Sequence, residues 1–456
     1  MQKTISPIDG SIVAELAYHE PAAVDAILDQ AVQAQRAWRR QPLDARAAAV
    51  AAFTDAVVAK KDVLAEELTR QMGRPLGQTP GEIGGFEDRA KAMIRLAPEA
   101  LAPVEPGPKE GFTRYITREP LGVVLVLAPW NYPYLTAVNA IVPALLAGNA
   151  VVLKHSDQTP LVAERLAEAA ASTLPEGLLV SLVATHETVA KVVGDARVDH
   201  VCFTGSVEGG RAVHRAAADR FIATGLELGG KDPAYVAADA DLEFTVPNVV
   251  DGAFFNSGQS CCGIERVYVH ESVYDRFVEA FIEATKAYVL GDPMDAATNL
   301  GPVARARSAE AIQSQIDAAV KAGATAHIQS PYPGAERGPA YLGPQVLTGV
   351  DHSMTIMNEE TFGPVVGIQK VANDEEAVRM MNDSAYGLTA SIWTPDLARA
   401  QKLGSELETG TVFMNRCDYL DPELAWVGVK DSGRGATLSK VGFEYLTRPK
   451  SFHLRH

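Results

Sequence analysis

Short, wholly apolar segments alternate with helix-like segments in the middle of this chain. Residues 123–127 are Val-Val-Leu-Val-Leu, and a second apolar run at 150–153 precedes a helical pattern at 160–173. The alternation continues in the segments 178–183, 201–203 and 209–220. Strands that are apolar on both faces are typical of a parallel sheet covered by helices on both sides. The pattern predicts an α/β architecture of the nucleotide-binding type, which does not by itself give a function.

A second alternating stretch begins near Pro233 and predicts a second α/β domain. Its expected strands are 266–269, 365–371, 389–393 and 411–414, and its expected helices are 273–288 and 304–322. The chain has 456 residues. Single hydrophobic cores stop growing at about 250–300 residues, so two or more domains are expected.

The two ends of the chain differ from this pattern. Helices are expected at 21–40 and at 43–72, where Gly73-Arg74-Pro75 ends the second region. The Pro-rich segment 98–109 is predicted to be non-helical, and 112–118 alternates like an exposed strand. The tail 443–454 has strand character. It could pair with the strand at 112–118 or with another subunit.

Composition excludes several classes of function. The formal net charge is −16, so the chain repels phosphate backbones and nucleic-acid binding is not expected. Cys202, Cys261, Cys262 and Cys417 are too few for a disulfide framework and include no CxxC pair, which argues against zinc. The first 20 residues do not resemble a signal peptide, and no apolar stretch reaches the about 18–20 residues of a membrane span. A cytoplasmic protein without a metal or membrane contact is expected.

Two adjacent cysteines follow a turn loosened by glycine. An apolar helix at 246–255 is expected to break at Gly258 and to deliver Cys261 and Cys262. On such a turn a cysteine can be exposed, and backbone N–H groups can stabilise its thiolate. A cysteine chosen at random is more often a buried small hydrophobe. Here the polar, turn-forming neighbours favour a nucleophile.

Two polar side chains stand at the ends of apolar segments. Glu227 lies in Leu-Glu-Leu-Gly-Gly, where burial would raise its pKa and suit it to act as a general base. A glutamate that points to solvent is the alternative. Asn131 follows the strand 123–127, at the edge where α/β sheets build their sites. Its NH₂ could donate to an oxyanion, or the residue could simply form a turn.

Glycines separate a strand from a helix in Phe-Thr-Gly-Ser-Val-Glu-Gly-Gly at 203–210. Such glycines let a pyrophosphate approach the backbone at a helix N-terminus. The spacing differs from GxGxxG, and a plain strand–helix turn would need no ligand.

In their order along the chain, these motifs resemble those of the aldehyde dehydrogenase superfamily, nearest to its semialdehyde and broad-specificity bacterial branches. The matching segments are 129–131 (Pro-Trp-Asn), Lys154, 203–206 (Phe-Thr-Gly-Ser), 227–231 (Glu-Leu-Gly-Gly-Lys), 258–261 (Gly-Gln-x-Cys), 360–364 (Glu-x-Phe-Gly-Pro) and 430–433 (Lys-x-Ser-Gly). The resemblance implies a Rossmann-like cofactor domain, a second α/β catalytic domain and a small β oligomerisation element. Their expected ranges are 1–98 with 121–228, 229–442, and 99–120 with 443–456.

The resemblance also implies an activity, the NAD(P)-dependent oxidation of an aldehyde to a carboxylic acid. Cys261 would be the nucleophile that forms a thiohemiacetal and then a thioester. Glu227 would activate the hydrolytic water, and Asn131 with the backbone N–H of Cys261 would form the oxyanion hole. The residues that would bind the cofactor are Lys154, Asp157, Gly205, Ser206, Glu360, Phe362 and Trp130.

The chain departs from the family pattern at two places. Asp157 stands where a glutamate is frequent. It can accept from ribose hydroxyls, which favours NAD, but it is one methylene shorter and leaves room for the 2′-phosphate of NADP. NAD is therefore the expected cofactor, with NADP possible, and the neighbouring His155 is expected at the surface. Ala436-Thr437 replace a frequent Arg-Glu pair. If that glutamate relays protons in relatives, Glu227 must exchange them by another route.

The resemblance places a substrate pocket around Tyr132, Cys262, Arg416, Asp418 and Trp426. Its aromatic residues predict an apolar or aromatic aldehyde. Arg416 could instead bind the carboxylate of a semialdehyde, unless Asp418 simply neutralises it.

Three other functions remain open. A dehydrogenase that releases a CoA thioester is disfavoured because such relatives commonly lack the water-activating glutamate. A non-catalytic NAD-binding relative would keep the fold without turnover. A cysteine hydrolase would leave the cofactor motifs unexplained. The family's oligomerisation strand matches 98–120 and 443–456 in position, and an exposed strand edge needs cover, so a homodimer or homotetramer is expected.

Overall fold

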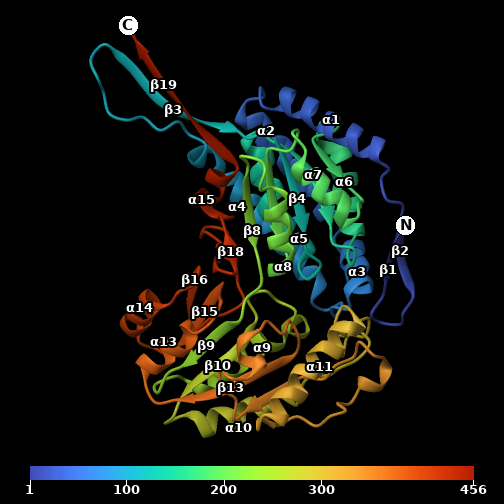
Figure 1. The fold of residues 1–456 in the computed structure, drawn as a ribbon, viewed down its shortest axis with the longest axis vertical. Coiled ribbons are helices and arrows are strands. Elements are labelled where there is room, and N and C mark those ends of the chain that lie inside the picture. The colour runs from blue at the N-terminus through green and yellow to red at the C-terminus, as the bar shows by residue number, and fades with distance from the viewer.

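The computed structural model describes residues 1–456 and divides them between two large sheets in separate lobes, with a two-stranded arm on the upper lobe (Figure 1). The upper sheet has six strands in the order β18-β8-β7-β4-β5-β6, and the lower sheet has seven in the order β11-β12-β13-β10-β9-β15-β16. Most neighbouring strands are parallel. The expected α/β architecture is confirmed.

The upper sheet contains the apolar runs predicted from the sequence. Its strands are β4 (Val123–Ala128), β5 (Ala150–His155), β6 (Leu179–Ser181), β7 (His200–Thr204), β8 (Ala223–Glu227) and β18 (Gly433–Arg434). Every residue of β4 and β5 is buried, as central strands of a doubly covered sheet require. Their covering helices are α1 (Pro21–Trp38), α5 (Pro133–Ala147), α6 (Leu161–Thr173), α7 (His186–Gly194) and α8 (Val207–Ala216). Strand β18 pairs antiparallel with β8 and so brings the C-terminal segment beside Glu227.

The largest apolar core lies between this sheet and three more helices. They are α2 (Leu43–Val58), α3 (Lys61–Met72) and α4 (Thr79–Ala100). Phe53, Phe86 and Tyr134 are almost wholly buried and stack edge to face, with ring centroids 6.3 and 6.4 Å apart. This contact joins α2, α4 and α5 into one layer.

The lower sheet is built from the second alternating stretch. Its strands are β9 (Asp232–Val236), β10 (Ile264–His270), β11 (Thr325–Ala326), β12 (Gln345–Thr348), β13 (Val365–Val371), β15 (Thr389–Trp393) and β16 (Thr411–Met414). Its helices are α9 (Leu242–Phe254), α10 (Tyr274–Thr285), α11 (Ala306–Lys321), α12 (Thr355–Asn358), α13 (Asp374–Asn382) and α14 (Leu397–Glu406). The strands and long helices expected in this half are present, with ends that shift by up to three residues.

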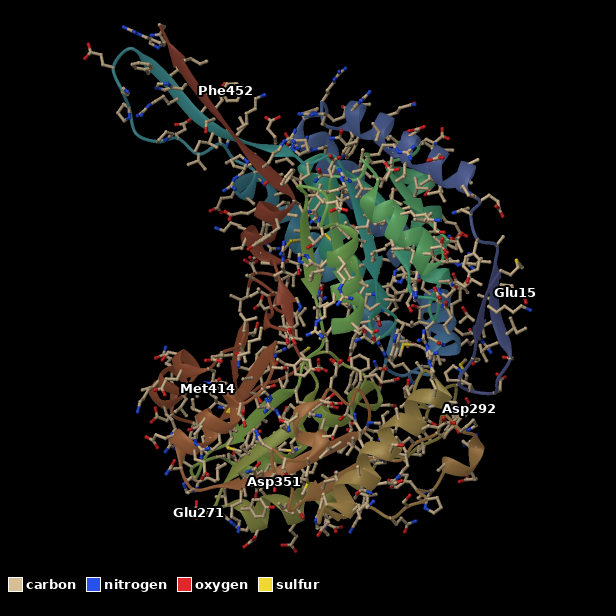
Figure 2. The ribbon with its side chains drawn as sticks, viewed as in Figure 1. Glu15, Glu271, Asp292, Asp351, Met414 and Phe452 are labelled. Atoms are coloured by element: carbon tan, nitrogen blue, oxygen red, sulfur yellow. The ribbon has the colours of Figure 1, made fainter.

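The arm pairs two segments far apart in the sequence. Strand β3 (Phe112–Pro120) runs antiparallel to β19 (Thr447–Arg455) over nine residues each. Phe112 stacks on His453, and Tyr115 stacks on Phe452, which is labelled on the arm in Figure 2. Of the two partners left open for the tail, this strand is the one with which it pairs in the chain, and the C-terminus lies at the tip of the arm (Figure 1).

Several predicted boundaries were wrong. The region 43–72 contains two helices, because Lys60 leaves the helical conformation before α3 begins. Pro98 lies inside the last turn of the unpredicted helix α4, where its missing N–H removes only one hydrogen bond. The helix expected at 209–220 ends at Ala216. Phe443 belongs to helix α15 (Ser439–Tyr445) and not to the strand that follows.

His155 was also predicted wrongly. It was expected at the surface but is buried as the last residue of β5. Burial lowers its pKa to about 3, so the imidazole is neutral.

The remaining elements are short. They are β1 (Gln2–Ile5), β2 (Ile12–Leu16), β14 (Tyr386–Gly387), β17 (Val429–Lys430), and the 3₁₀ turns η1 (Phe255–Gly258) and η2 (Ala335–Arg337). None of the helices is both long enough and apolar enough to cross a membrane. No cluster of three or more His, Cys, Asp or Glu side chains is placed to hold a metal ion.

Candidate active site

A cleft of about 650 Å³ lies between the two lobes and is lined by residues of both. It contains most of the site residues predicted from the sequence. These are Trp130, Asn131, Lys154, Asp157, Gly205, Ser206, Glu227, Cys261, Glu360 and Phe362. The carboxyl ends of β4, β5, β7 and β8 meet at this cleft, which is where parallel sheets build their sites.

The loop that carries Cys261 follows an abrupt helix end. Helix α9 stops at Phe254, and Asn256 and Ser257 then adopt left-handed φ values of 52° and 57°. Consecutive residues of this kind cannot continue a right-handed helix. Gly258 is also left-handed, and a Cβ on it would lie 2.2 Å from the carbonyl oxygen of Gly363. The predicted break is confirmed, although it starts before Gly258, and it leaves Cys261 half-buried beside the cleft.

Asn131 is in contact with a buried ion pair formed by Arg74 and Glu82. Its carbonyl accepts hydrogen bonds from the Arg74 guanidinium and from Asn256 Nδ2. Arg74 also donates to Asn256 Oδ1 at 3.1 Å and pairs with Glu82 at 2.5 Å. Arg74 and Glu82 are each only 2% exposed. Arg74 therefore joins the Asn131 turn to the loop before Cys261, a role that the sequence reasoning missed because Arg74 was taken only as part of a helix end.

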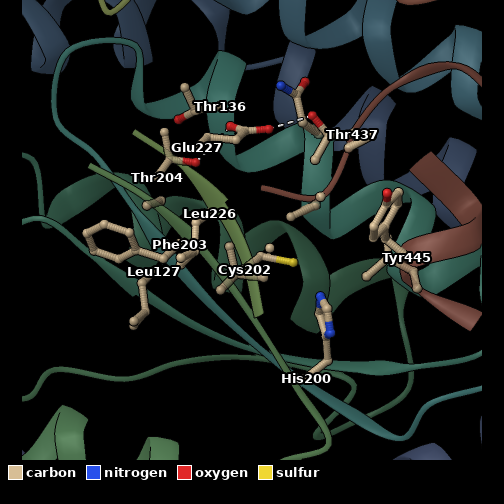
Figure 3. Close-up of a pocket in the computed structure, with 18 of the residues that line it drawn as sticks. Leu127, Thr136, His200, Cys202, Phe203, Thr204, Leu226, Glu227, Thr437 and Tyr445 are labelled. Carbon is tan, nitrogen blue, oxygen red and sulfur yellow. Dashed lines mark hydrogen bonds between the residues drawn. The ribbon is translucent and has the colours of Figure 1, made fainter. Parts of the chain in front are cut away.

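Glu227 ends β8 between two hydroxyl groups. Its carboxylate accepts from Thr204 Oγ1 at 2.9 Å and from Thr437 Oγ1 at 2.5 Å (Figure 3). Burial raises the pKa of Glu227, while these two hydrogen bonds and the charge of Arg89 act in the opposite direction. The expected upward shift is confirmed. The alternative of a solvent-facing glutamate is wrong, because the side chain lies within the upper lobe.

One end of the cleft is suited to a nucleoside. Lys154 Nζ lies 2.8 Å from Asp157 Oδ1 at the end of β5. Two arginines of the lower lobe, Arg305 and Arg307, line the same cleft. Arg305 donates to Gln158 Oε1 at 3.0 Å. The sequence reasoning missed both arginines because they lie in a different lobe from Lys154.

The start of α8 is suited to a pyrophosphate. Ser206 caps the helix and accepts from Gly209 N at 3.1 Å, and both residues line the cleft, so the N-terminus of α8 borders it. A Cβ on Gly205 or on Gly209 would approach the Phe203 ring to 2.7 Å. A side chain on either side of this turn would therefore have to displace the Phe203 ring.

Glu360 and Phe362 lie at the other end of the cleft. Glu360 Oε1 accepts from Gly230 N at 3.1 Å, and burial, aided by Glu265, raises the pKa of Glu360 to about 8. A Cβ on Gly229 would lie 2.3 Å from the Glu360 carboxylate. Phe362 packs edge to face on Trp130, with ring centroids 5.5 Å apart. Together with the nucleoside end and the α8 turn, these residues fit a dinucleotide such as NAD(P).

The residues predicted to surround the substrate differ in their contacts and in their exposure to solvent. Asp418 Oδ1 accepts from Cys262 Sγ at 3.0 Å and from Ser260 Oγ at 2.8 Å. The pKa of the Cys262 thiol is raised well above its ordinary value, first by a hydrogen bond with Cys261 and then by burial. Arg416 is exposed and lies over the Tyr419 ring at 3.6 Å. Asp418 makes no ion pair with Arg416.

The two predicted aromatic residues have less access to solvent than Arg416. Tyr132 packs beneath the Arg74 guanidinium, 4.4 Å from the ring centroid. Trp426 is 4% exposed and belongs to the apolar core of the upper lobe.

Arg89 is a further cation that the sequence reasoning missed. It is 8% exposed, and it donates to the Leu135 carbonyl at 2.5 Å and to Asn139 Oδ1 at 3.2 Å. Burial lowers its pKa, and the charge of Glu227 acts in the opposite direction. No carboxylate forms an ion pair with Arg89, because the only acceptors that it contacts are neutral.

Comparison with known proteins places this site in a family. The model of the aldehyde dehydrogenase family matches residues 1–452. A 3,6-anhydro-alpha-L-galactose dehydrogenase of Streptomyces coelicolor is 37% identical over 463 residues, which cover 99% of this chain and 92% of that protein. A succinate-semialdehyde dehydrogenase (NADP+) of Mycobacterium avium is 35% identical over 453 residues, which cover 98% and 95% of the two chains.

A solved structure supports the same assignment. The succinic semialdehyde dehydrogenase of Streptococcus pyogenes, crystallised in complex with NADP+, matches with a TM-score of 0.94 at 29% sequence identity, and the match covers 100% of both chains. The family match and these relatives each span almost the whole sequence. The chain belongs to the aldehyde dehydrogenase family.

Proposed function

We propose that this chain oxidises an aldehyde to its carboxylic acid through a thioester on Cys261, with NAD(P) as the hydride acceptor. The observation that carries the proposal is the meeting of Cys261, Asn131 and Glu227 in one cleft that also fits a dinucleotide. A nucleophile, a donor for an oxyanion and a base are the groups that acyl chemistry on a thiol requires.

The first step is addition of the Cys261 thiolate to the aldehyde carbon. The carbonyl oxygen becomes an oxyanion, to which the Asn131 NH₂ and the backbone N–H of Cys261 would donate. Loss of one such donor typically costs about 3–4 kcal/mol of transition-state stabilisation. The Arg74 contacts to Asn131 and Asn256 keep these donors in position.

The chemistry that NAD(P) would supply when bound in the cleft is that of a hydride acceptor, which would turn the adduct into a thioester. Lys154 and Asp157 would bind its adenosine ribose, Gly205 and Ser206 its pyrophosphate, and Glu360 its second ribose. Trp130 and Phe362 would pack at the nicotinamide end.

Hydrolysis of the thioester regenerates the enzyme. Glu227 takes a proton from a water molecule as the water oxygen attacks the thioester carbon. The C–S bond breaks, Cys261 leaves as a thiolate, and the carboxylic acid is released. The raised pKa of Glu227 matches this step, because a base with a pKa nearer neutrality accepts a proton more readily.

NAD is the proposed preferred cofactor, and NADP is proposed as a second one. The Asp157 carboxylate can accept from ribose hydroxyls and repels a 2′-phosphate. Lys154, Arg305 and Arg307 line the same cleft and would offset that repulsion. The M. avium relative is a succinate-semialdehyde dehydrogenase (NADP+), and the S. pyogenes structure is a complex with NADP+.

The organisation of the whole protein is proposed on the same basis. Residues 1–98 and 121–228 would bind the cofactor, 229–442 would form the catalytic domain, and 99–120 with 443–456 would join subunits into a homodimer or homotetramer. The four cysteines are all free, which supports a reducing cytoplasmic location.

The test is to follow reduced-nicotinamide absorbance with NAD and with NADP over a panel of aldehydes. The panel should pair each carboxylate-bearing aldehyde with an uncharged aldehyde of equal length, together with aromatic aldehydes. Cys261→Ala is expected to abolish turnover with all of them. Arg89→Gln and Arg416→Gln are then compared with the wild type. If one of these changes raises KM only for the carboxylate-bearing member of a pair, the arginine it removes binds the substrate carboxylate.

Two outcomes would contradict the proposal. Folded protein that binds NAD and turns over no aldehyde would support a non-catalytic relative. Turnover that requires CoA and yields a CoA thioester would support an acylating dehydrogenase. Ester hydrolysis that needs no nicotinamide must be checked in Glu227→Gln, because it could also be a side reaction of the same thiol.

A further inference from the structure

A second, smaller cavity shares Glu227 and Thr204 with the cofactor cleft, and Figure 3 shows residues that line it. It offers about 30 Å³ to the centres of water molecules, and one buried water needs roughly 10–15 Å³ on this measure. The cavity therefore has room for about two waters. Strands β4, β7 and β8, helix α5 and the segments 434–437 and 445–446 line it.

Two residues that line this cavity carry buried polar atoms without partners. Asn139 Nδ2 and His200 Nδ1 are both buried and have no hydrogen-bond partner, although both residues line the cavity. Burial lowers the pKa of His200 to about 4, so its imidazole is neutral and can both donate and accept. Buried polar groups are rarely left unpaired in folded proteins, and water is their usual partner.

Gly225 keeps the cavity open. His200, Cys202 and Thr204 alternate with their neighbours along β7, so their side chains share one face of the sheet. Their partners on β8 are Ala223, Gly225 and Glu227. A Cβ on Gly225 would meet no atom nearer than His200 Nε2 at 3.8 Å. The missing side chain at Gly225 thus leaves an open path between Glu227 and His200.

The cavity also reaches the surface. Arg434 and Tyr445 line it, and both are exposed. The end at Glu227 is closed by the hydroxyls of Thr204 and Thr437. Polar groups therefore mark both ends of a short passage from the buried carboxylate towards solvent.

Glu227 needs such a passage. Under the proposed function, each thioester hydrolysis leaves one proton on its carboxylate, and that proton must reach solvent before the next turnover. Thr437 occupies the position of a frequent glutamate but has no ionisable group, so it cannot hold the proton itself. A threonine hydroxyl can still donate to one oxygen while it accepts from a water.

We propose that the cavity holds water and is the proton outlet of Glu227, with Gly225 keeping it open and His200 and Asn139 anchoring the water. The proton moves from Glu227 to the cavity water and leaves between Arg434 and Tyr445. His200 and Gly225 are positioning residues, because they act through water and do not touch substrate or cofactor. The inference rests on the proposed function.

The test is the rate at which the acyl-enzyme decays. Enzyme and aldehyde are mixed with NAD in a rapid-quench instrument, and the Cys261 thioester is quantified by mass spectrometry. In the same mixture, the hydride step is reported by a burst of reduced nicotinamide, which is measured by its absorbance. Gly225→Ala places a methyl group in the cavity and needs no unusual backbone angle. His200→Phe keeps the ring but removes both nitrogens.

Both variants are expected to keep the wild-type burst and to slow thioester decay roughly tenfold or more, with a larger solvent deuterium isotope effect on the decay. The matched control is Thr224→Val. This residue precedes Gly225, but its side chain lies on the opposite face of the strand, and it too has a buried, unpartnered hydroxyl. Thioester decay in the control should equal that of the wild type.

The outcomes separate the two proposals. Wild-type protein with neither a burst nor a thioester overturns the proposed function. A wild-type burst, with thioester decay unchanged in both Gly225→Ala and His200→Phe, overturns the proton outlet alone. Slower decay in Thr224→Val by the same factor would also overturn it, because the effect would then come from general disturbance of β8.

Discussion

The two threonine hydroxyls beside Glu227 control how easily this carboxyl ionises. Both hydrogen bonds favour the charged carboxylate and lower the pKa of Glu227. Burial favours the neutral carboxyl and raises that pKa. Thr437→Val removes one of these hydrogen bonds and should raise the pKa of Glu227 further. A hydrogen bond to a charged group is worth about 1.5–3 kcal/mol, which corresponds to about one to two pH units.

The sign of this effect can be checked in the pH profile. Glu227 acts as a base only when deprotonated, so activity is lost as pH falls through its pKa. The acid limb of kcat in Thr437→Val should therefore move to higher pH, while Thr437→Ser should keep the wild-type profile. An acid limb that does not move in Thr437→Val would show that a different group controls it.

Asp157 is expected to decide between the two cofactors. Its carboxylate lies 2.8 Å from Lys154 Nζ and would repel a 2′-phosphate. Asp157→Ser removes the negative charge and frees the lysine, so KM for NADP should fall by about tenfold while KM for NAD rises. Steady-state kinetics with both cofactors measure the ratio. A preference that stays the same in Asp157→Ser would assign the discrimination to Arg305 and Arg307.

At the level of single residues, sequence patterns predict only some of the candidate site residues. Cys261, Glu227 and Asn131 could be named because each lies in a short motif next to a glycine, a proline or an apolar strand. Arg74, Arg89 and His200 could not, because each is defined by partners distant in sequence. The Arg74–Asn256 contact, for example, joins residues 182 positions apart.

At the level of elements, the parallel strands were predictable and several helices were not. An apolar run such as β4 or β5 allows few alternatives, because only a doubly covered strand is buried throughout. Helix α4 was missed because its burial comes from packing on α2 and α5, and its glycines and prolines are not typical of a helix. Its end at Ala100 shows that a proline in the last turn is tolerated.

The buried pair Arg74–Glu82 ties the start of α4 to the catalytic loops, and its loss should be costly. Arg74→Met would leave Glu82 as an uncompensated buried charge, and such a change typically costs about 3–5 kcal/mol. The midpoint of denaturant unfolding should fall, and activity should fall with it, because Asn131 loses its support.

The exposed pair Arg70–Glu66 on α3 provides the matched control. Both of its side chains are about half exposed, and pairs of this kind contribute about 0.3–0.5 kcal/mol. Arg70→Met should leave the unfolding midpoint and the activity nearly unchanged. Equal losses in Arg70→Met and Arg74→Met would argue against a special role for the buried pair.

At the level of the whole molecule, the arm is the part that is least supported by packing against the rest of the chain. A two-stranded ribbon is marginally stable alone, and the arm stands away from the upper lobe (Figure 1). The β3–β19 ribbon leaves strand edges that can pair with another chain. Its aromatic stacks stiffen the ribbon without covering those edges. A second copy of the chain would cover them.

Deletion of residues 448–456 should therefore dissociate the protein. This change removes almost all of β19 and keeps Leu446, whose carbonyl accepts from Asn149 in the upper lobe. Sedimentation velocity should give a dimer or tetramer of the 48.6 kDa chain for the wild type and a single, slightly smaller chain for the deletion. Circular dichroism and the Cys261 burst would show that both lobes remain folded. A wild-type protein that already sediments as one chain would show that the arm does not join subunits, and an oligomer that survives the deletion would place the interface elsewhere on the lobes.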